Sequence, residues 1–229
     1  MKYFQILFGI FCLNLNASYE ITVLATNISN YDGFGEWSFS ALYESDKESI
    51  LFDTGFHEDT VLHNAKVLNK DLSKVEKVIL SHFHSDHTGG LIKLRKTYKP
   101  FNKNAFKNVY VTKGFFAQRY TASGDLVGPG NYPDANKFKK DAEGEGITFI
   151  ILDSHAEIAK DLYATGTVLR TDEYYNGPKG LLVRDGKSNS LVEDIIVDDQ
   201  SAGMLTNSGW IMMSGCGHSG IINTAKKLQ

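Results

Sequence analysis

Cysteine is scarce in this chain, and its scarcity narrows the class of protein. The 229 residues include two cysteines, Cys12 and Cys216. If Cys12 is removed with a signal peptide, Cys216 alone remains and no intrachain disulfide framework can form. A small disulfide-stapled domain is thereby excluded, but the cysteine count leaves the redox compartment open.

An excess of charge of either sign is also lacking. Twenty-four Lys and Arg stand against 27 Asp and Glu, which gives a formal net charge of −3. No global field therefore points to nucleic acid or to an anionic membrane. Internal repeats and low-complexity linkers are absent as well. The composition, 42% hydrophobic and 22% charged, is typical of a globular protein with a well-filled core.

The N-terminal apolar run is too short for the roughly 20 residues of a membrane-spanning helix. It extends from Ile6 to Leu15, after one Lys and before the small residues at 17–18. This order is typical of a secretory signal peptide. We therefore expect a signal peptide at 1–18, a domain at 19–229, a secreted or periplasmic protein, and no stable membrane span after signal removal. If the run is instead a buried first element, we expect a cytoplasmic protein.

Strand-like and helix-like segments alternate along the rest of the chain, which predicts an α/β (α+β) fold over a helical bundle. Helical spacing of apolar residues predicts a helix over 58–69, and further helices are expected from Leu91 and after His218. Period-2 alternation and short apolar runs predict strands at 20–25, 37–43, 49–53, 77–80, 108–112, 147–152, 162–170, 180–183, 202–206 and 210–214.

Residues suited to metal binding are concentrated in one loop, SHFHSDHTGG at 81–90. This loop follows the predicted strand 77–80 and precedes a predicted helix, so rigid elements hold both of its ends. A cation would gather its three imidazoles and one carboxylate, which are His82, His84, Asp86 and His87. Such a mixture suits Zn²⁺, with Fe or Mn as alternatives.

The pattern HxHxDH after a short apolar strand resembles the signature of the metallo-β-lactamase superfamily. Asp53 in LFDTG matches the position of that superfamily's first motif. The segments DDQ at 198–200 and SGCGHSGIINT at 214–224 resemble one branch, the hydrolase-like proteins named after a dihydropterin-ribofuranosyl-aminobenzene-phosphate synthase. The resemblance extends from about residue 20 to the end of the chain. It implies an αββα sandwich with one or two metals at the edge between its two sheets.

The resemblance also implies a role for each residue of the pattern. The first metal is expected to bind His82, His84 and His218. The second metal is expected to bind Asp86 and His87. Because metal-bound imidazoles usually need a partner on the other nitrogen, Asp53 is expected to orient a ligand or steady the loop without touching the metal.

Cys216 and three further histidines remain to be assigned a role. Cys216 is a candidate additional ligand of the second metal, and the alternative is a small buried cysteine at the end of a strand. The remaining histidines lack a ligand-like neighbour at short spacing and are expected to be structural. They are His57, His63 and His155.

A bound Zn²⁺ lowers the pKa of its water from 15.7 to roughly 7, which makes hydrolysis the expected reaction. Asp86 is suited to orient that water and accept its proton. We therefore expect a metal-dependent hydrolase acting on a small ester, lactone or phosphate-bearing substrate. The alternatives are a non-catalytic or weakly active metal-binding relative, and oxygen or sulfur chemistry at a di-iron centre.

A basic and aromatic stretch follows the metal motif, with no acidic residue between Asp86 and Asp125. It could steer an anionic substrate towards the metals. The alternative is a solvated helix face with aromatic residues turned to the core, and nucleic-acid binding is not expected because no companion motif is present. Its basic residues are Lys93, Arg95, Lys96, Lys99, Lys103, Lys107, Lys113 and Arg119.

The C-terminus departs from the family pattern. Relatives carry one more ligand histidine in a GGxHL-like segment, whereas this chain ends at Gln229, eleven residues after His218. Its last five residues have no helix stop signal. We therefore expect a chain truncated at the C-terminus, with an incomplete sandwich, one tightly bound metal and a weak second site.

Overall fold

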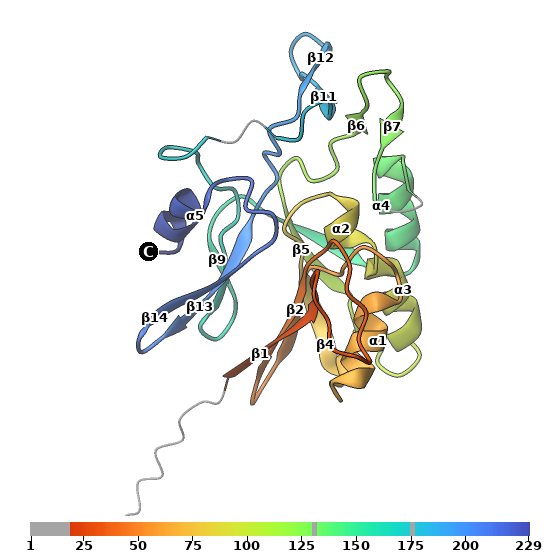
Figure 1. The fold of residues 1–229 in the computed structure, drawn as a ribbon, viewed down its shortest axis with the longest axis vertical. Helices are drawn as coiled ribbons and strands as arrows, with labels where there is room; N and C mark the ends of the chain where they lie inside the picture. Colours follow the sequence, from red (N-terminus) through yellow and green to blue (C-terminus); the bar gives the residue numbers. More distant parts are fainter. Residues whose placement is uncertain (1–18, 130–131, 175–176) are drawn as a thin grey trace, which may run out of the picture.

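Two β-sheets packed face to face form the body of the molecule, with helices on both outer faces (Figure 1). The computed structural model describes residues 19–129, 132–174 and 177–229. The predicted signal peptide at 1–18, with Cys12, lies outside the described residues. None of the helices within the described ranges is long and apolar enough to cross a lipid bilayer.

The first sheet has six strands in the order β1-β2-β3-β4-β5-β8. The strands are β1 (Tyr19–Ala25), β2 (Ser40–Ser45), β3 (Ser49–Phe52), β4 (Val75–Ile79), β5 (Asn108–Thr112) and β8 (Thr148–Leu152). The pairs from β1 to β3 are antiparallel, and those from β3 to β8 are parallel. Parallel neighbours need crossover connections. These contain α1 (Thr60–Val67), the 3₁₀ turn Leu72–Lys74, α2 (Ser85–Thr88), α3 (Leu91–Tyr98) and α4 (Ala135–Gly144).

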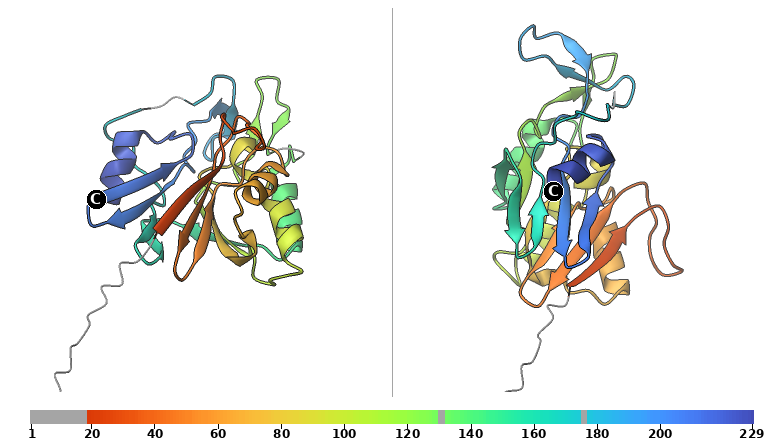
Figure 2. Two further views of the ribbon diagram at one scale, coloured as in Figure 1. Left: turned by 60° about the horizontal axis from the view of Figure 1, so that its bottom comes forward. Right: turned by 90° about the vertical axis from the view of Figure 1, so that its left-hand side faces the viewer.

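The second sheet has four antiparallel strands in the order β14-β13-β10-β9. They are β9 (Ala156–Ala159), β10 (Leu162–Ala164), β13 (Ser201–Thr206) and β14 (Gly209–Ser214). Helix α5 (Ile221–Leu228) covers its outer face, where a Cβ added to Gly203 would lie 2.7 Å from Leu228 Cδ1. A small third sheet extends beyond the sandwich (Figure 2). It consists of β6 (Arg119–Tyr120), β7 (Leu126–Val127), β11 (Leu182–Arg184) and β12 (Leu191–Glu193).

Two apolar cores separate the layers. One lies between the first sheet and its helices, and includes Leu51 and Val78 from strands and Leu94 from α3. The other lies between the two sheets, where Phe52 and Ile79 pack with Leu162 and Met213. Neighbouring residues of β3 and β4, such as Leu51 and Phe52, enter different cores because successive side chains point to opposite faces of the sheet. The predicted αββα sandwich is confirmed.

Several predicted boundaries are wrong, for local reasons. The strand expected at 37–43 begins at Ser40, because the Phe39 amide donates to Asp86 O and Trp37 is exposed. The strand expected at 162–170 ends at Ala164. There Gly166 has a φ of +60° and lies against the Ser154 backbone, so the chain turns out of the sheet.

The longest helix of the described residues, α4, was not predicted from the sequence. Its start is marked by Asp134, whose carboxylate accepts hydrogen bonds from the amides of Asn136 and Lys137. Its buried side chains, Ala135, Phe138 and Ala142, have helical spacing. The short strands β6, β7, β9 and β12, with two to four residues each, are also absent from the prediction.

Candidate metal centre

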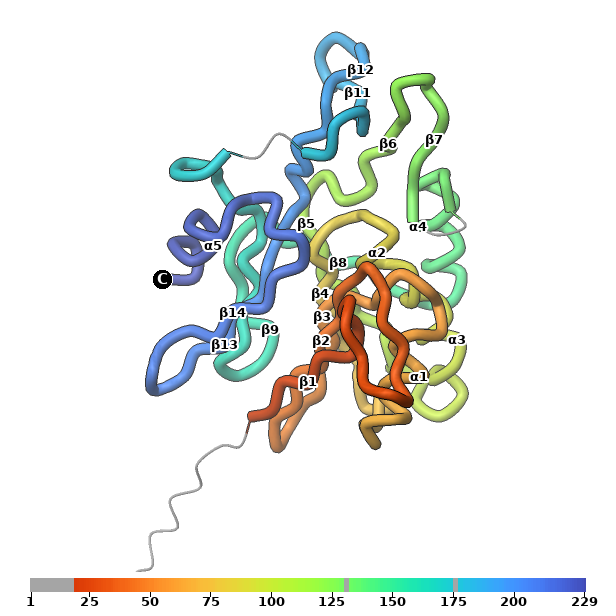
Figure 3. The backbone as a smooth tube through the Cα atoms, in the orientation of Figure 1, coloured from red at the N-terminus to blue at the C-terminus, as the bar shows by residue number. Residues whose placement is uncertain are grey.

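Two loops far apart in the sequence meet at one edge of the sandwich. The first runs from β4 into α2, and the second from β14 into α5 (Figure 3). Their contact is close: a Cβ added to Gly215 would lie 2.5 Å from Ser81 Oγ and 3.1 Å from Asp53 Oδ2. Glycine at 215 therefore allows the second loop to approach the first.

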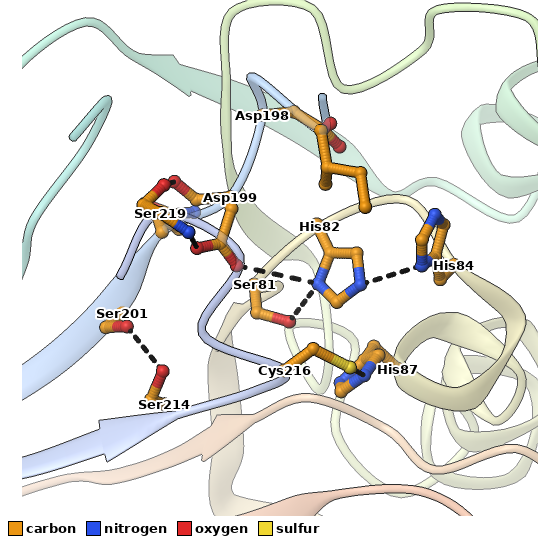
Figure 4. Close-up of polar contacts among 12 residues, drawn as sticks. Ser81, His82, His84, His87, Asp198, Asp199, Ser201, Ser214, Cys216 and Ser219 are labelled. Carbon is orange, nitrogen blue, oxygen red and sulfur yellow. Dashed lines mark hydrogen bonds and ion pairs between the residues drawn. The ribbon is translucent and has the colours of Figure 1, made fainter. Parts of the chain in front are cut away.

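Three imidazoles are clustered where the loops meet. His82 Nε2 lies 2.9 Å from His84 Nδ1 (Figure 4). The ring centroids of His82 and His218 are 4.6 Å apart, and those of His84 and His218 are 5.5 Å apart. Two facing imidazole nitrogens can share one proton, or both can donate lone pairs to a cation.

The three imidazoles are held in the neutral form that binds metals. Burial, reinforced by the charges of neighbouring histidines, lowers the pKa of His82 well below its ordinary value. Burial and then Arg119 lower the pKa of His84 to about 3. Burial and then His87 lower that of His218 to about 4. All three lone-pair nitrogens are thus available at neutral pH.

A second group lies beside the first. His87 Nε2 is 3.3 Å from Asp86 Oδ2 and 3.2 Å from Cys216 Sγ. Burial opposes the protonation of His87. The charge of Asp53 and the hydrogen bonds that His87 makes with Asp53, Asp86 and Cys216 outweigh burial and raise the pKa of His87 well above its ordinary value. For Asp86, the hydrogen bond and charge of His87 outweigh burial and lower the pKa. This group therefore favours a positive charge at its centre.

Asp53 has the position expected for an orienting residue. Its Oδ2 lies 2.6 Å from His87 Nδ1 and accepts a hydrogen bond from Ser81 Oγ at 2.8 Å. Its Oδ1 accepts one from the Ser81 amide at 2.7 Å. Asp53 has a φ of +56°, a left-handed conformation that aspartate tolerates better than most residues. It thereby fixes His87 with Nε2 directed at Cys216 and Asp86.

The donor atoms fit a metal, although their grouping differs in part from the expected one. Among the described residues, one set of donor atoms within 4.8 Å of one another comes from His82, Cys216 and His218, and the other from Asp86, His87 and Cys216. His84 belongs to neither set, although its Nδ1 lies 2.9 Å from His82 Nε2. Cys216 is exposed and belongs to both sets, so the reading of it as a small buried cysteine is wrong.

An ion-pair anchor behind the site was not recognised from the sequence. Arg119, at the start of β6, donates from Nε to Asp194 and from an Nη atom to Asp198, both at 2.6 Å. Asp198 also accepts from the Phe83 amide at 2.8 Å, and Arg119 donates to Phe83 O. All of these groups are buried. The anchor therefore ties the small third sheet to the histidine loop.

The other two residues of the DDQ segment brace the same loop. Gln200 donates from its side-chain Nε2 to Leu80 O and from its backbone N–H to Ser81 O. Asp199 Oδ2 accepts from the Ser219 amide at 2.7 Å, while its buried Oδ1 has no hydrogen-bond partner in the described structure and lies 3.8 Å from His82 Nδ1. Burial raises the pKa of Asp199 to about 6.

The basic stretch divides into two kinds of residue. Arg119 anchors the loop, and Arg95 is buried with its guanidinium donating to three backbone carbonyls. These two cannot attract a substrate. Lys93 and Lys96 instead line a cavity of about 690 Å³ beside α2, together with Phe56 and others. None of the six clustered metal-site residues lines this cavity.

The remaining histidines lie apart from the cluster. His63 Nε2 contacts Asp32 O at 2.6 Å, and its ring stacks on Phe34. His155 is exposed and stacks on Tyr163. His57 is exposed beside Phe56. Each of the three has an ordinary structural environment.

Comparisons with known proteins agree with the fold. A family model described as the metallo-β-lactamase superfamily matches residues 38–100. A synthase of Methanocaldococcus jannaschii, 7,8-dihydropterin-6-methyl-4-(β-D-ribofuranosyl)-aminobenzene-5′-phosphate synthase, is 27% identical over 91% of this chain and 71% of its own. An uncharacterised protein of the same organism is 29% identical over 90% and 72%.

The solved structure of Tm1679, described as a metal-dependent hydrolase of the β-lactamase superfamily, is also similar. It superimposes with a TM-score of 0.68 at 25% identity, covering 91% of this chain and 70% of Tm1679. The fold implies a metal cofactor. The resemblance to the metallo-β-lactamase superfamily is thus confirmed, and the chain has the mixed α/β fold of that superfamily.

Proposed function

We propose that the chain is a metal-dependent hydrolase that acts on a small ester, lactone or phosphate-bearing substrate. The observation that carries this proposal is the convergence of neutral imidazoles, one carboxylate and one thiol from two loops at one edge of the sandwich. His82, His84 and His218 would hold one metal, and Asp86 and His87 would hold another. Zn²⁺ suits this mixture best, with Fe or Mn as alternatives.

A bound divalent metal would lower the pKa of a coordinated water to about 7 and polarise the bond under attack. The chain itself supplies orientation and proton transfer. Asp86 is ionised, about one-sixth exposed and hydrogen-bonded to His87, so its carboxylate can orient water and accept a proton. Asp53 holds the ring of His87 in place from the opposite nitrogen.

Two observations bear on phosphate-bearing substrates alone, although the cavity concerned is not lined by the metal-site residues. The name of the Methanocaldococcus relative refers to a 5′-phosphate, and that relative is a synthase rather than a hydrolase. In this chain, Lys93 and Lys96 line the cavity beside α2. We therefore include phosphate-bearing molecules among the substrates to be tested. Export to the periplasm or medium remains a proposal that rests on residues 1–18 of the sequence.

Chelation and metal return test the proposed activity. The full chain would be assayed on p-nitrophenyl esters, lactones and p-nitrophenyl phosphates before chelation, after it, and after return of Zn²⁺, Mn²⁺ or Fe²⁺. We expect hydrolysis to vanish with chelation, to return with one metal, and to fall at least tenfold in Asp86→Asn but not in His155→Ala. Hydrolysis that resists chelation would contradict the proposal. Metal binding without turnover would favour the non-catalytic alternative.

A further inference from the structure

We propose that the thiolate of Cys216 is a ligand shared by both metal positions and bridges them. This inference rests on the proposed function, because it requires that the cluster bind metal. The sequence pattern suggested Cys216 only as an additional ligand of the second metal. The structure places its sulfur between two sets of donors, which is a different and more specific arrangement.

The distances fit a sulfur in the shared position. Cys216 Sγ lies 3.2 Å from His87 Nε2 and 3.9 Å from Asp86 Oδ2, and its side chain is directed at His87 (Figure 4). Two ligands of one tetrahedral zinc, with Zn–S near 2.3 Å and Zn–N near 2.0 Å, lie about 3.5 Å apart. The same sulfur is within 4.8 Å of the donor nitrogens of His82 and His218.

The backbone around Cys216 is built to place the sulfur there. Gly215 leaves no room for a Cβ against Ser81 and Asp53, so the loop is pressed onto the histidine loop. Gly217 then takes a φ of +66°, which turns the chain towards α5. Cys216, between the two glycines, is thereby turned towards His87 at the meeting point of the loops.

Charge and ligand number favour a bridge over a terminal ligand. Two divalent ions about 3.5–4 Å apart repel strongly, and an anion between them reduces that repulsion. Asp86 is the one carboxylate in the two sets of donor atoms among the described residues, and the donors other than Asp86 and Cys216 are imidazoles. A bridging thiolate gives the second position a third protein ligand without removing one from the first. Thiolate sulfur is also well suited to zinc, iron and cobalt.

Cobalt titration of the full chain tests the bridge. Metal-free protein would be titrated with Co²⁺ while the d–d bands and the near-ultraviolet thiolate-to-cobalt charge-transfer band are recorded. We expect the charge-transfer band to grow through both the first and the second equivalent. Cys216→Ser should lose that band and the second equivalent but keep the d–d bands of the first. Cys12→Ser is the matched control and should behave as wild type.

The outcomes separate the bridge from the proposed function. Cobalt binding without a charge-transfer band would leave the metal site intact and overturn the inference. A band that saturates at one equivalent would show a terminal ligand and also overturn it. Absence of cobalt binding would overturn both proposals. As a second measurement, two equivalents of Zn²⁺ should slow iodoacetamide alkylation of Cys216 at least tenfold, and unchanged alkylation would contradict the bridge.

Discussion

The loop after β4 and the loop after β14 contribute to one site in different ways. The first carries four candidate ligands within six residues, at 82–87, so its chemistry can be read from the sequence. The second carries Cys216 and His218, and these reach the cluster only because the two sheets pack face to face. Local spacing therefore predicts four of the six candidate ligands, while the other two depend on the contact between the loops.

Loss of an imidazole from the first loop should have the largest effect. His82→Ala removes a buried candidate ligand that contacts His84 and lies next to His218, so most bound metal should be lost. Elemental analysis of purified variants measures this. His155→Ala, at an exposed position just before β9, is the control and should retain wild-type metal content. Equal metal in the two variants would remove His82 from the ligand set.

The anchor behind the loops should have the next largest effect. Arg119→Met leaves the carboxylates of Asp194 and Asp198 buried without their cationic partner. Breaking a buried ion pair in this way lowers the free energy of unfolding by about 3–5 kcal/mol. Urea unfolding measures the change. Arg184→Met, at the exposed end of the neighbouring strand β11, should leave the midpoint nearly unchanged. If both variants unfold alike, the ion pairs do not hold the third sheet to the site.

The contact between the loops can be changed at a single glycine. Gly215→Ala adds a Cβ against Ser81 and Asp53, and overpacking of this kind typically costs about 1–3 kcal/mol. We expect a lower melting temperature and a smaller rise in that temperature on adding Zn²⁺. Gly144→Ala, at the end of α4 with open space around it, is the control. A normal response to Zn²⁺ in Gly215→Ala would show that the metal site tolerates displacement of the second loop.

The smallest expected effect lies outside both loops. Lys96 and Lys99 are exposed, and each already lies within 4 Å of Glu145, at 3.8 and 3.6 Å. Replacing both with Gln should raise KM for a phosphate-bearing substrate by less than about tenfold and weaken its dependence on salt. Lys187→Gln, in an exposed turn, is the control. An unchanged KM and salt dependence would make this stretch a solvated face only.

Much of the sandwich could be predicted because its strands are short, apolar and separated by polar turns. β1, β3, β5, β8, β13 and β14 lie within one or two residues of their predicted bounds. α4 was missed because its buried face is only three residues among polar ones, and its signal is a capping Asp134. The short strands β6, β7, β9 and β12 form because of tertiary pairing, and two to four residues are too few to show a strand pattern in the sequence.

The site was predictable to the extent that it is local. His82, His84, Asp86 and His87 come from one loop, and the structure places them together. Asp53 was expected to orient a ligand, and it contacts His87 and Ser81. Arg119 was grouped with surface cations because the sequence does not show that Asp194 and Asp198 face it across 75 and 79 residues. Pairings of this length are properties of the fold.

The central claim is that both loops hold metal together, and anomalous scattering at the zinc edge tests it most directly. Crystals of the full chain grown with Zn²⁺ should show an anomalous peak about 2.0–2.3 Å from donor atoms of His82 and His218. A second peak should lie between Asp86 and His87, and Cys216 Sγ should be within bonding distance of both anomalous peaks. Peaks confined to surface residues, or none in the cluster, would contradict the account.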